Sequence, residues 1–286
     1  MNEIKKIPYL GIGMGLRTDI AEDTFAHGAN IDAVEIITEN FFSHLGPKKQ
    51  TLLDRSRKRF HVIPHGIQLS IGSCVPIPTA YLKEVKRLTD LLKSPYYSDH
   101  FAFVRHDDLH DIGHLSPIWY TKETLEEVVK RVDQVQQFLG IPLVLENITA
   151  SYAIPEADYE EPEFIAEVCR RTGCGFLLDV TNILINSYNR HEDAQKLIER
   201  YPMDRVVHVH LAGGEVHDGH FYDSHSAEIS GPNEGVWPLL EWVARHADIK
   251  VLIIERDDDF KEDFEAMVLK DLARARAIVE AGRAAA

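Results

Sequence analysis

The sequence is poor in cysteine and in positive charge, and it lacks any long apolar run. Its 286 residues include three cysteines, Cys74, Cys169 and Cys174, which are too few, and odd in number, for a disulfide-stabilised scaffold. No apolar run approaches the roughly 20 residues that a membrane-spanning helix needs. The segment Met1 to Leu10 carries lysines with no apolar stretch behind them, unlike a signal peptide. These features predict a cytoplasmic protein with no membrane partner.

Acidic residues outnumber basic ones. Asp plus Glu is 46 and Lys plus Arg is 31, so the formal net charge is −15. Binding to a phosphate backbone draws largely on cationic side chains, and we therefore expect no nucleic acid partner. No repeat or low-complexity linker divides the chain, so we interpret residues 1–286 as a single domain.

Eight short apolar runs, rich in β-branched residues, alternate with helical patterns along the chain. Stretches such as LVLEN, FLLDV and VLIIE are continuously apolar, as in strands buried on both faces. Eight strand–helix units at this length predict an α/β fold, a single (β/α)₈ TIM barrel. The competing doubly wound sheet normally carries a Gly-rich phosphate loop after its first strand, and GIGMG at 11–15 lacks the dinucleotide-binding spacing. The expected strands are Tyr9–Gly15, Ala33–Thr38, Val62–Ile71, Tyr96–Val104, Pro142–Ile148, Gly175–Thr181, Val206–Gly213 and Lys250–Asp257.

Helical periodicity separates these runs. Thr121–Leu139 places Leu125, Val128 and Val132 at three-to-four spacing, with Thr121 as a helix start and Gly140 as a stop. The other expected helices are Ala80–Leu92, Pro162–Arg171, Glu192–Arg200, Val236–Arg245 and Phe260–Val279, with further helices near Asp19–His27 and Thr51–Arg59.

Potential metal ligands follow the carboxyl ends of most expected strands, where TIM barrels gather their chemistry. One further loop offers an Asp-x-His pair, which lets a single extended segment supply two ligands to one ion. The candidates are His65, His100, Glu146, Asp179 with Asn182 three residues on, His210, Glu255, and the loop pair Asp223 and His225.

Three of these candidates are carboxylates placed at the ends of continuous apolar strands. An isolated buried charge is costly, and Glu146, Asp179 and Glu255 converging on one barrel mouth would repel one another. Arg256 is the only lysine or arginine at a comparable strand end. Divalent metal ions between the carboxylates meet the requirement for positive charge.

The histidines support the same interpretation. His208 and His210 are two apart on one expected strand and so face the same way, which leaves one as a ligand and the other as its support. Other polar clusters favour plainer roles: the loop 106–114 is expected to be solvated, and 257–259 to be a charged turn. Cys169 and Cys174 have the wrong spacing for a zinc site and are expected to pack in the core.

The order of the motifs resembles a known family. GIGMGLR, ITEN at 37–40, HGIQLSIG, SDHF, LVLENIT, RTGCGFLLDVTN, VHLAG, DSH and IIERD span nearly the whole chain. Together they resemble the multinuclear non-heme iron-dependent oxidases, one of which helps to make the copper-binding peptide methanobactin. The resemblance implies a TIM barrel of the xylose-isomerase-like kind that holds two or three iron ions (Fe²⁺/Fe³⁺).

The resemblance also implies a distribution of ligands. His65, His100 and Glu146 would hold one iron; Glu146, Asp179, His210 and Glu255 a second, with Glu146 bridging; and Asn182, Asp223 and His225 a third. The second set would form the catalytic centre. His208 stands where many relatives have a glutamate, and it would support the ligands rather than join them. Arg17, Glu39, Asn40 and Asn147 lie near expected strand ends and could contact a peptide or the ligands.

The implied activity is the O₂-dependent modification of a residue, most often cysteine, in a ribosomally made precursor peptide, with a small partner protein that recognises the peptide. Two other hypotheses remain open. The ligand layout is also similar to that of endonuclease IV, a trinuclear zinc phosphoesterase, although Asn182 stands where that enzyme has a histidine. An amide oxygen is a harder donor than imidazole and favours iron or manganese over zinc. The third possibility is a non-catalytic metal-binding barrel.

Overall fold

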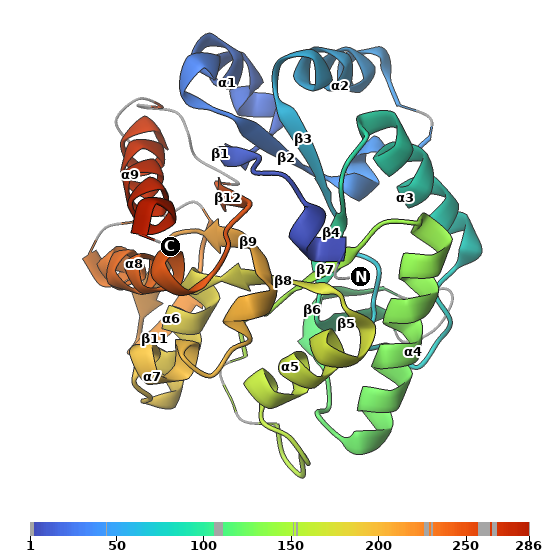
Figure 1. The fold of residues 1–286 in the computed structure, drawn as a ribbon, viewed down its shortest axis with the longest axis vertical. Helices are drawn as coiled ribbons and strands as arrows, with labels where there is room; N and C mark the ends of the chain where they lie inside the picture. The colour runs from blue at the N-terminus through green and yellow to red at the C-terminus, as the bar shows by residue number, and fades with distance from the viewer. Residues whose placement is uncertain are drawn as a thin grey trace.

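The barrel predicted from the sequence is present in the computed structural model, which describes residues 3–43, 45–105, 111–150, 152, 154–225, 229, 231–256, 264 and 268–285. Eight parallel strands close on themselves, and helices surround them (Figure 1). Each barrel strand lies between its neighbours in chain order, as the (β/α)₈ prediction requires. The strands are β1 (Gly11–Gly15), β2 (Ala33–Ile37), β3 (His61–His65), β4 (Tyr97–His100), β7 (Leu143–Glu146), β8 (Gly175–Asp179), β9 (Val206–Leu211) and β12 (Val251–Ile254).

The outer helices bury one apolar face each against the barrel. In α4 (Lys122–Leu139) the buried positions Leu125, Val128 and Val132 follow helical spacing, Thr121 Oγ1 accepts from Thr124 N at 3.2 Å, and Gly140 ends the helix at φ 75°. The other α-helices are α1 (Ala21–Ala26), α2 (Pro47–Arg59), α3 (Thr79–Leu92), α5 (Glu161–Thr172), α6 (Val180–Arg190), α7 (Ala194–Ile198), α8 (Val236–His246) and α9 (Lys270–Ala285). Short 3₁₀ helices are η1 (Glu3–Lys6), η2 (Thr18–Ile20), η3 (Gly28–Asn30), η4 (Thr38–Phe41), η5 (Met203–Arg205) and η6 (Gly231–Gly235). None of the described helices is both long and apolar enough to cross a membrane.

Two antiparallel hairpins extend from the carboxyl ends of barrel strands, and the sequence predicted neither. One pairs β5 (Ala102–Arg105) with β6 (Asp111–Pro117), so the expected strand Tyr96–Val104 is in fact two strands. The other pairs β10 (Gly214–His217) with β11 (His220–Asp223). The loop 106–114, expected to be solvated, is therefore partly the strand β6. Three expected features lie outside the described residues: loop residues 106–110, the turn 257–259 and the start of the helix at Phe260.

Two other boundaries differ from the sequence prediction. The strand expected to reach Ile71 ends at His65, because the chain turns at Gly66, where a Cβ atom would lie 1.8 Å from the hydroxyl of Tyr97. Helix α6 was not predicted: Asp179 is both the last residue of β8 and the N-cap of α6, which leaves no linker to mark the change.

The interior of the barrel is apolar at the amino ends of the strands and polar at the carboxyl ends. Buried residues of several strands, among them Ile63, Val144 and Val251, form one cluster with Ile4 and Ile7 from the amino-terminal segment, which lies across this end of the barrel (Figure 1). This apolar layer leaves the opposite mouth as the place for chemistry.

A β-bulge changes which side chains of β9 face inward. The register between β8 and β9 shifts after Phe176, which pairs with Val206, while Leu177 pairs with His208. Val207 and His208 therefore both face the interior, and His210 follows on the same face. The bulge adds Val207 to the interior layer, and the two histidines follow it toward the carboxyl end of the strand.

The three cysteines are free thiols. Cys169 and Cys174 are buried with their sulfur atoms 3.6 Å apart, in the packing position expected of them, and Cys74 is exposed.

Helix α5 starts with a buried acid. Glu160 and Glu163 form a reciprocal capping box. Glu161, the first residue of the helix, is 6% exposed, and one of its oxygens lies 3.7 Å from Arg190 Nη2. Burial raises the pKa of Glu161 to about 7, although Arg190 acts in the opposite direction. The ionised carboxylate is therefore less favourable in the folded chain than in the unfolded chain.

This raised pKa predicts a pH-dependent stability. The contribution of Glu161 is fully present below its unfolded pKa of about 4.5 and is lost as pH rises through about 7. Relative to Glu161→Gln, the wild type should lose about 2–3 kcal/mol of unfolding free energy between pH 4.5 and 8, as the shift of pKa implies. Denaturant unfolding of both proteins at several pH values measures this difference. A difference that stays constant with pH would contradict the assignment.

Candidate metal centre

Three neighbouring strands bring His65, His100 and Glu146 together. Each is the last residue of its strand, β3, β4 and β7, and these strands are adjacent in the barrel. Glu146 Oε2 lies 3.4 Å from His65 Nε2 and 3.3 Å from His100 Nε2. All three side chains are buried, and one ligand atom from each lies within 4.8 Å of the others. This group could hold one metal ion.

A second group shares Glu146 with the first. Glu146 Oε1 lies 3.3 Å from His210 Nδ1, and Glu255 Oε2 lies 3.2 Å from the same nitrogen. Asp179 from β8 completes the group, and its four ligand atoms also lie within 4.8 Å of one another. The two oxygens of Glu146 therefore face the two groups separately.

Local hydrogen bonds position Asp179. Its Oδ1 caps α6 by accepting from Thr181 N at 2.7 Å and Asn182 N at 3.0 Å. The side-chain amide of Asn147 bonds to both the N–H and the carbonyl of Asp179, at 2.9 and 3.0 Å. Asn147 therefore joins the ends of β7 and β8, a supporting role rather than a ligand role.

Asn182 is oriented by the same network. Its Nδ2 donates to the carbonyl of Asn147 at 3.0 Å, and its Oδ1 is buried without a hydrogen-bond partner among the described residues. An amide oxygen in that situation has a lone pair available for a cation.

Asp223 and His225 meet the second group through Glu255. His225 Nε2 lies 3.2 Å from Asp223 Oδ1 and 3.6 Å from Glu255 Oε2. The side chains of Asp223 and His225 are 33% and 22% exposed, whereas Glu255 is 9% exposed. The third predicted position is thus the most open to solvent.

The carboxylates of the second group favour the charged form of the histidine among them. Burial lowers the pKa of His210, but the carboxylates of Glu255, Glu35 and Glu146 outweigh it and hold that pKa well above its ordinary value. Burial raises the pKa of Glu255, and the opposing effect of His210 and His225 prevails, so this pKa lies well below the usual range. Carboxylates on both edges of this ring thus favour positive charge around His210.

The pKa values of Asp179 and His100, which end β8 and β4, are also shifted. Burial, followed by repulsion from Glu146, raises the pKa of Asp179 well above its ordinary value. Burial lowers the pKa of His100, but attraction from Glu146 and Asp99 outweighs it and raises this pKa to about 9. Burial, followed by repulsion from His100 and His210, instead lowers the pKa of His65 well below its ordinary value. The carboxylates at the barrel mouth thus disfavour one another's charge and favour the charged form of His100.

The donor set fits divalent cations. Glu146 Oε2 and His210 Nδ1 are buried and lack hydrogen-bond partners among the described residues. Among the residues that the structure describes, the basic side chains paired with Glu146 and Glu255 are all histidines. Arg256, the alternative that the sequence offered, pairs instead with Asp271 of α9 at 3.3 Å. Buried oxygen and imidazole donors of this kind suit iron, manganese or zinc.

The three remaining residues predicted to contact a peptide or support the ligands lie beside the loops. Glu39 Oε1 accepts from the backbone of Ile67 and Gln68, both at 3.0 Å, and so holds the turn after β3. Asn40 is exposed, and its carbonyl and amide oxygens accept from Lys49 Nζ. Arg17 follows β1, half-buried, with Nη1 3.4 Å from the carbonyl of Leu16.

Comparison with known proteins identifies the family. The family model described as "RiPP precursor modification enzyme MbnB/TglH/ChrH", for enzymes acting on ribosomally made precursor peptides, matches residues 11–280. The chain belongs to this family. It is 36% identical over 252 residues to a UPF0276 protein of Anaeromyxobacter sp. (87% of this chain, 86% of the relative) and 33% identical over 272 residues to one of Caulobacter vibrioides (94% and 95%).

Solved structures confirm the fold of this MbnB/TglH/ChrH-family chain. An L-ribulose 3-epimerase matches with a TM-score of 0.59 at 14% identity (96% of this chain, 95% of that chain). The D-psicose 3-epimerase of Clostridium cellulolyticum H10, with D-tagatose, gives 0.56 at 12% identity (96% and 99%). At this identity the likeness to the two epimerases concerns the fold alone.

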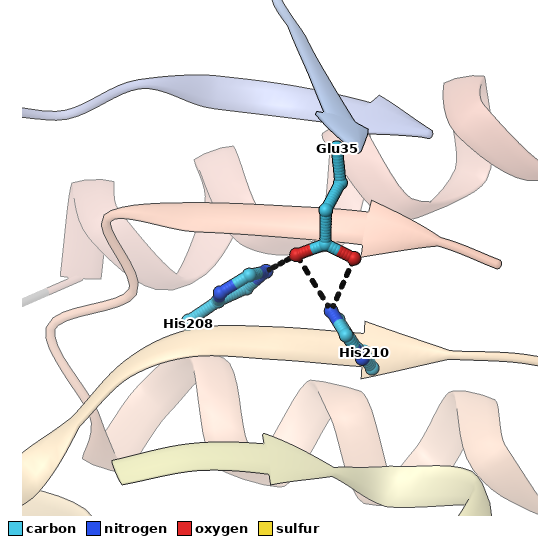
Figure 2. A group of neighbouring side chains, drawn as sticks. All are labelled: Glu35, His208 and His210. Carbon is cyan, nitrogen blue, oxygen red and sulfur yellow. Dashed lines mark hydrogen bonds and ion pairs between the residues drawn. The ribbon is translucent and has the colours of Figure 1, made fainter. Parts of the chain in front are cut away.

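One residue of the centre was missed by the sequence reasoning. Glu35, in the middle of β2, is buried at 3% exposure and faces His208 and His210 of β9, with which it forms a third His/Glu group (Figure 2). The search for ligands considered strand ends, and Glu35 lies two residues before the end of its strand. The available signal was a lone carboxylate in the apolar run AVEII, the kind of signal that singled out Glu146.

Proposed function

We propose that this chain is an O₂-dependent multinuclear non-heme iron oxidase that modifies a residue, most often cysteine, of a ribosomally made precursor peptide. The observation that carries the proposal is Glu146, whose two oxygens face two separate groups of buried ligands. The family match supports the substrate class. The amide donor of Asn182 favours iron over zinc.

The proposed ligands form three sets, as the family resemblance implies. His65, His100 and Glu146 would hold one ion, and Glu146, Asp179, His210 and Glu255 a second. Asn182, Asp223 and His225 would hold the third. Bound iron would supply Lewis acidity toward a substrate thiol and redox chemistry with O₂.

The residues of the chain would orient and shield this centre. The first two sets are buried at the bottom of the mouth, so water is excluded from them. The side bearing Asp223 and His225 is more exposed, and we place the approach of the peptide there. A small partner protein that recognises the peptide belongs to the proposal through the family resemblance.

Metal analysis of the purified protein, joined to Mössbauer spectroscopy and oxygen-uptake assays, tests the proposal. We expect two or more irons per chain and oxygen uptake that requires a precursor peptide with a thiol. Zinc alone, with cleavage of DNA at abasic sites, would replace the proposal with a phosphoesterase. Iron-loaded protein that consumes no oxygen with any peptide encoded beside its gene would indicate a non-catalytic metal-binding barrel.

A further inference from the structure

His210 lies between carboxylates on both edges of its ring. Its Nδ1 faces Glu146 and Glu255, while its Nε2 lies 3.2 Å from Oε1 and 3.3 Å from Oε2 of Glu35. A neutral imidazole carries one N–H, so a ring whose Nδ1 binds a metal ion keeps its proton on Nε2. Glu35 is the acceptor placed for that proton.

Glu35 also contacts His208, which lies nearer the amino end of β9 than His210. Glu35 Oε2 lies 3.5 Å from His208 Nε2 (Figure 2). The hydroxyl of Tyr96 lies 3.1 Å from His208 Nδ1. One assignment of protons fits these contacts: Tyr96 donates to His208 Nδ1, and His210 donates from Nε2 to Glu35. His208 Nε2 then faces Glu35 Oε2 as an ion-pair neighbour without a hydrogen bond. All four side chains are buried, so water does not compete for these bonds.

We propose that Glu35 and His208 are positioning residues of the metal centre, which keep the proton of His210 on Nε2 and its Nδ1 available as a ligand. The inference rests on the proposed metal centre. The register of β9 supports it, because His208 and His210 alternate regularly opposite Leu177 and Asp179 and so face the interior together.

The same three side chains could instead bind an additional ion, since their ligand atoms lie within 4.8 Å of one another. Such an ion would bind His210 through Nε2, while Nδ1 bound an ion of the second group. An imidazole that binds metal ions through both nitrogens must have lost both of its N–H protons. It would also face the apolar layer formed by Ala33, Val207 and Ile253. The hydrogen-bonded arrangement needs neither condition, and it is the one that we adopt.

The test measures metal affinity by competition with a chelator, together with the number of ions per chain, for wild type, Glu35→Gln and Glu35→Ala. We expect Glu35→Ala to weaken the position that His210 ligates by about 10–100-fold, the usual cost of losing a partner of a metal-bound histidine. In Glu35→Gln an amide oxygen still accepts from His210, so its affinity should lie between the other two. The matched control Glu126→Ala, an exposed acid on α4, should leave affinity unchanged.

Nuclear magnetic resonance of the Zn²⁺-loaded wild type, with ¹⁵N-labelled histidine, gives a second measurement that does not depend on any variant folding. The spectrum of His210 should show a protonated Nε2 and a bound Nδ1; a bound Nε2 would overturn the proposal. Unchanged affinity in Glu35→Ala would overturn this inference alone, and an extra ion lost from that variant would make the cluster a metal site instead. A wild type that binds no metal would overturn the proposed function as well.

Discussion

Replacing Glu146 by alanine should remove more than one metal ion per chain and reduce peptide-dependent oxygen uptake by about 100-fold or more. The expected size follows because loss of a group that merely supports a ligand already costs 10–100-fold. Glu146 contacts His65 and His100 through one oxygen and His210 through the other, so its removal affects both positions together. Elemental analysis after anaerobic reconstitution with Fe²⁺, followed by an oxygen-electrode assay, measures both effects.

Two further variants separate the loss of a bridge from general damage. Glu146→Gln keeps the size of the side chain and one oxygen donor, and should retain more metal than the alanine variant. Glu126→Ala removes an exposed carboxylate that pairs with Arg171 at 2.6 Å and should retain full metal and activity. Full iron content and activity in Glu146→Ala would show that the ligand assignment is wrong.

The sequence predicted the barrel because its strands carry two independent signals. Continuous apolar runs indicated burial on both faces, and their number and spacing matched eight strand–helix units. The register of the barrel then brought His65, His100 and Glu146 together, since parallel strands end at the same face. Their roles as ligands remain predictions that the experiments above test.

What the sequence could not supply depends on irregular backbone. The bulge that turns Val207 inward beside His208 has no signature in VVHVH, where simple alternation would give these two residues opposite faces. The support given by Asn147 depends on the exact approach of β7 to β8, and the hairpins depend on pairing between segments with weak strand patterns. Glu35 was visible as a residue type but not as a neighbour of His210, because that contact spans 175 positions of the chain.

A variant of Asn182 tests the third proposed metal position separately from the two that share Glu146. Asn182 Nδ2 donates to the carbonyl of Asn147, and its Oδ1 lacks a hydrogen-bond partner among the described residues. We expect Asn182→Ala to lose one ion per chain at most and to keep the positions that Glu146 bridges. Elemental analysis and Mössbauer spectroscopy should show one iron signal lost and the others unchanged, whereas the control Glu126→Ala, which alters an exposed acid on α4, should lose none.

The variant Asn182→His tests why this position carries an amide. Imidazole is a softer donor than an amide oxygen, so the histidine should raise the proportion of zinc over iron at the third position when both metals are supplied. The first two positions should keep their metal content, because their donors are unchanged. Loss of two ions from Asn182→Ala would place Asn182 within the bridged pair. An unaltered ratio of zinc to iron in Asn182→His would mean that the remaining donors, Asp223 and His225, set the metal preference of this position.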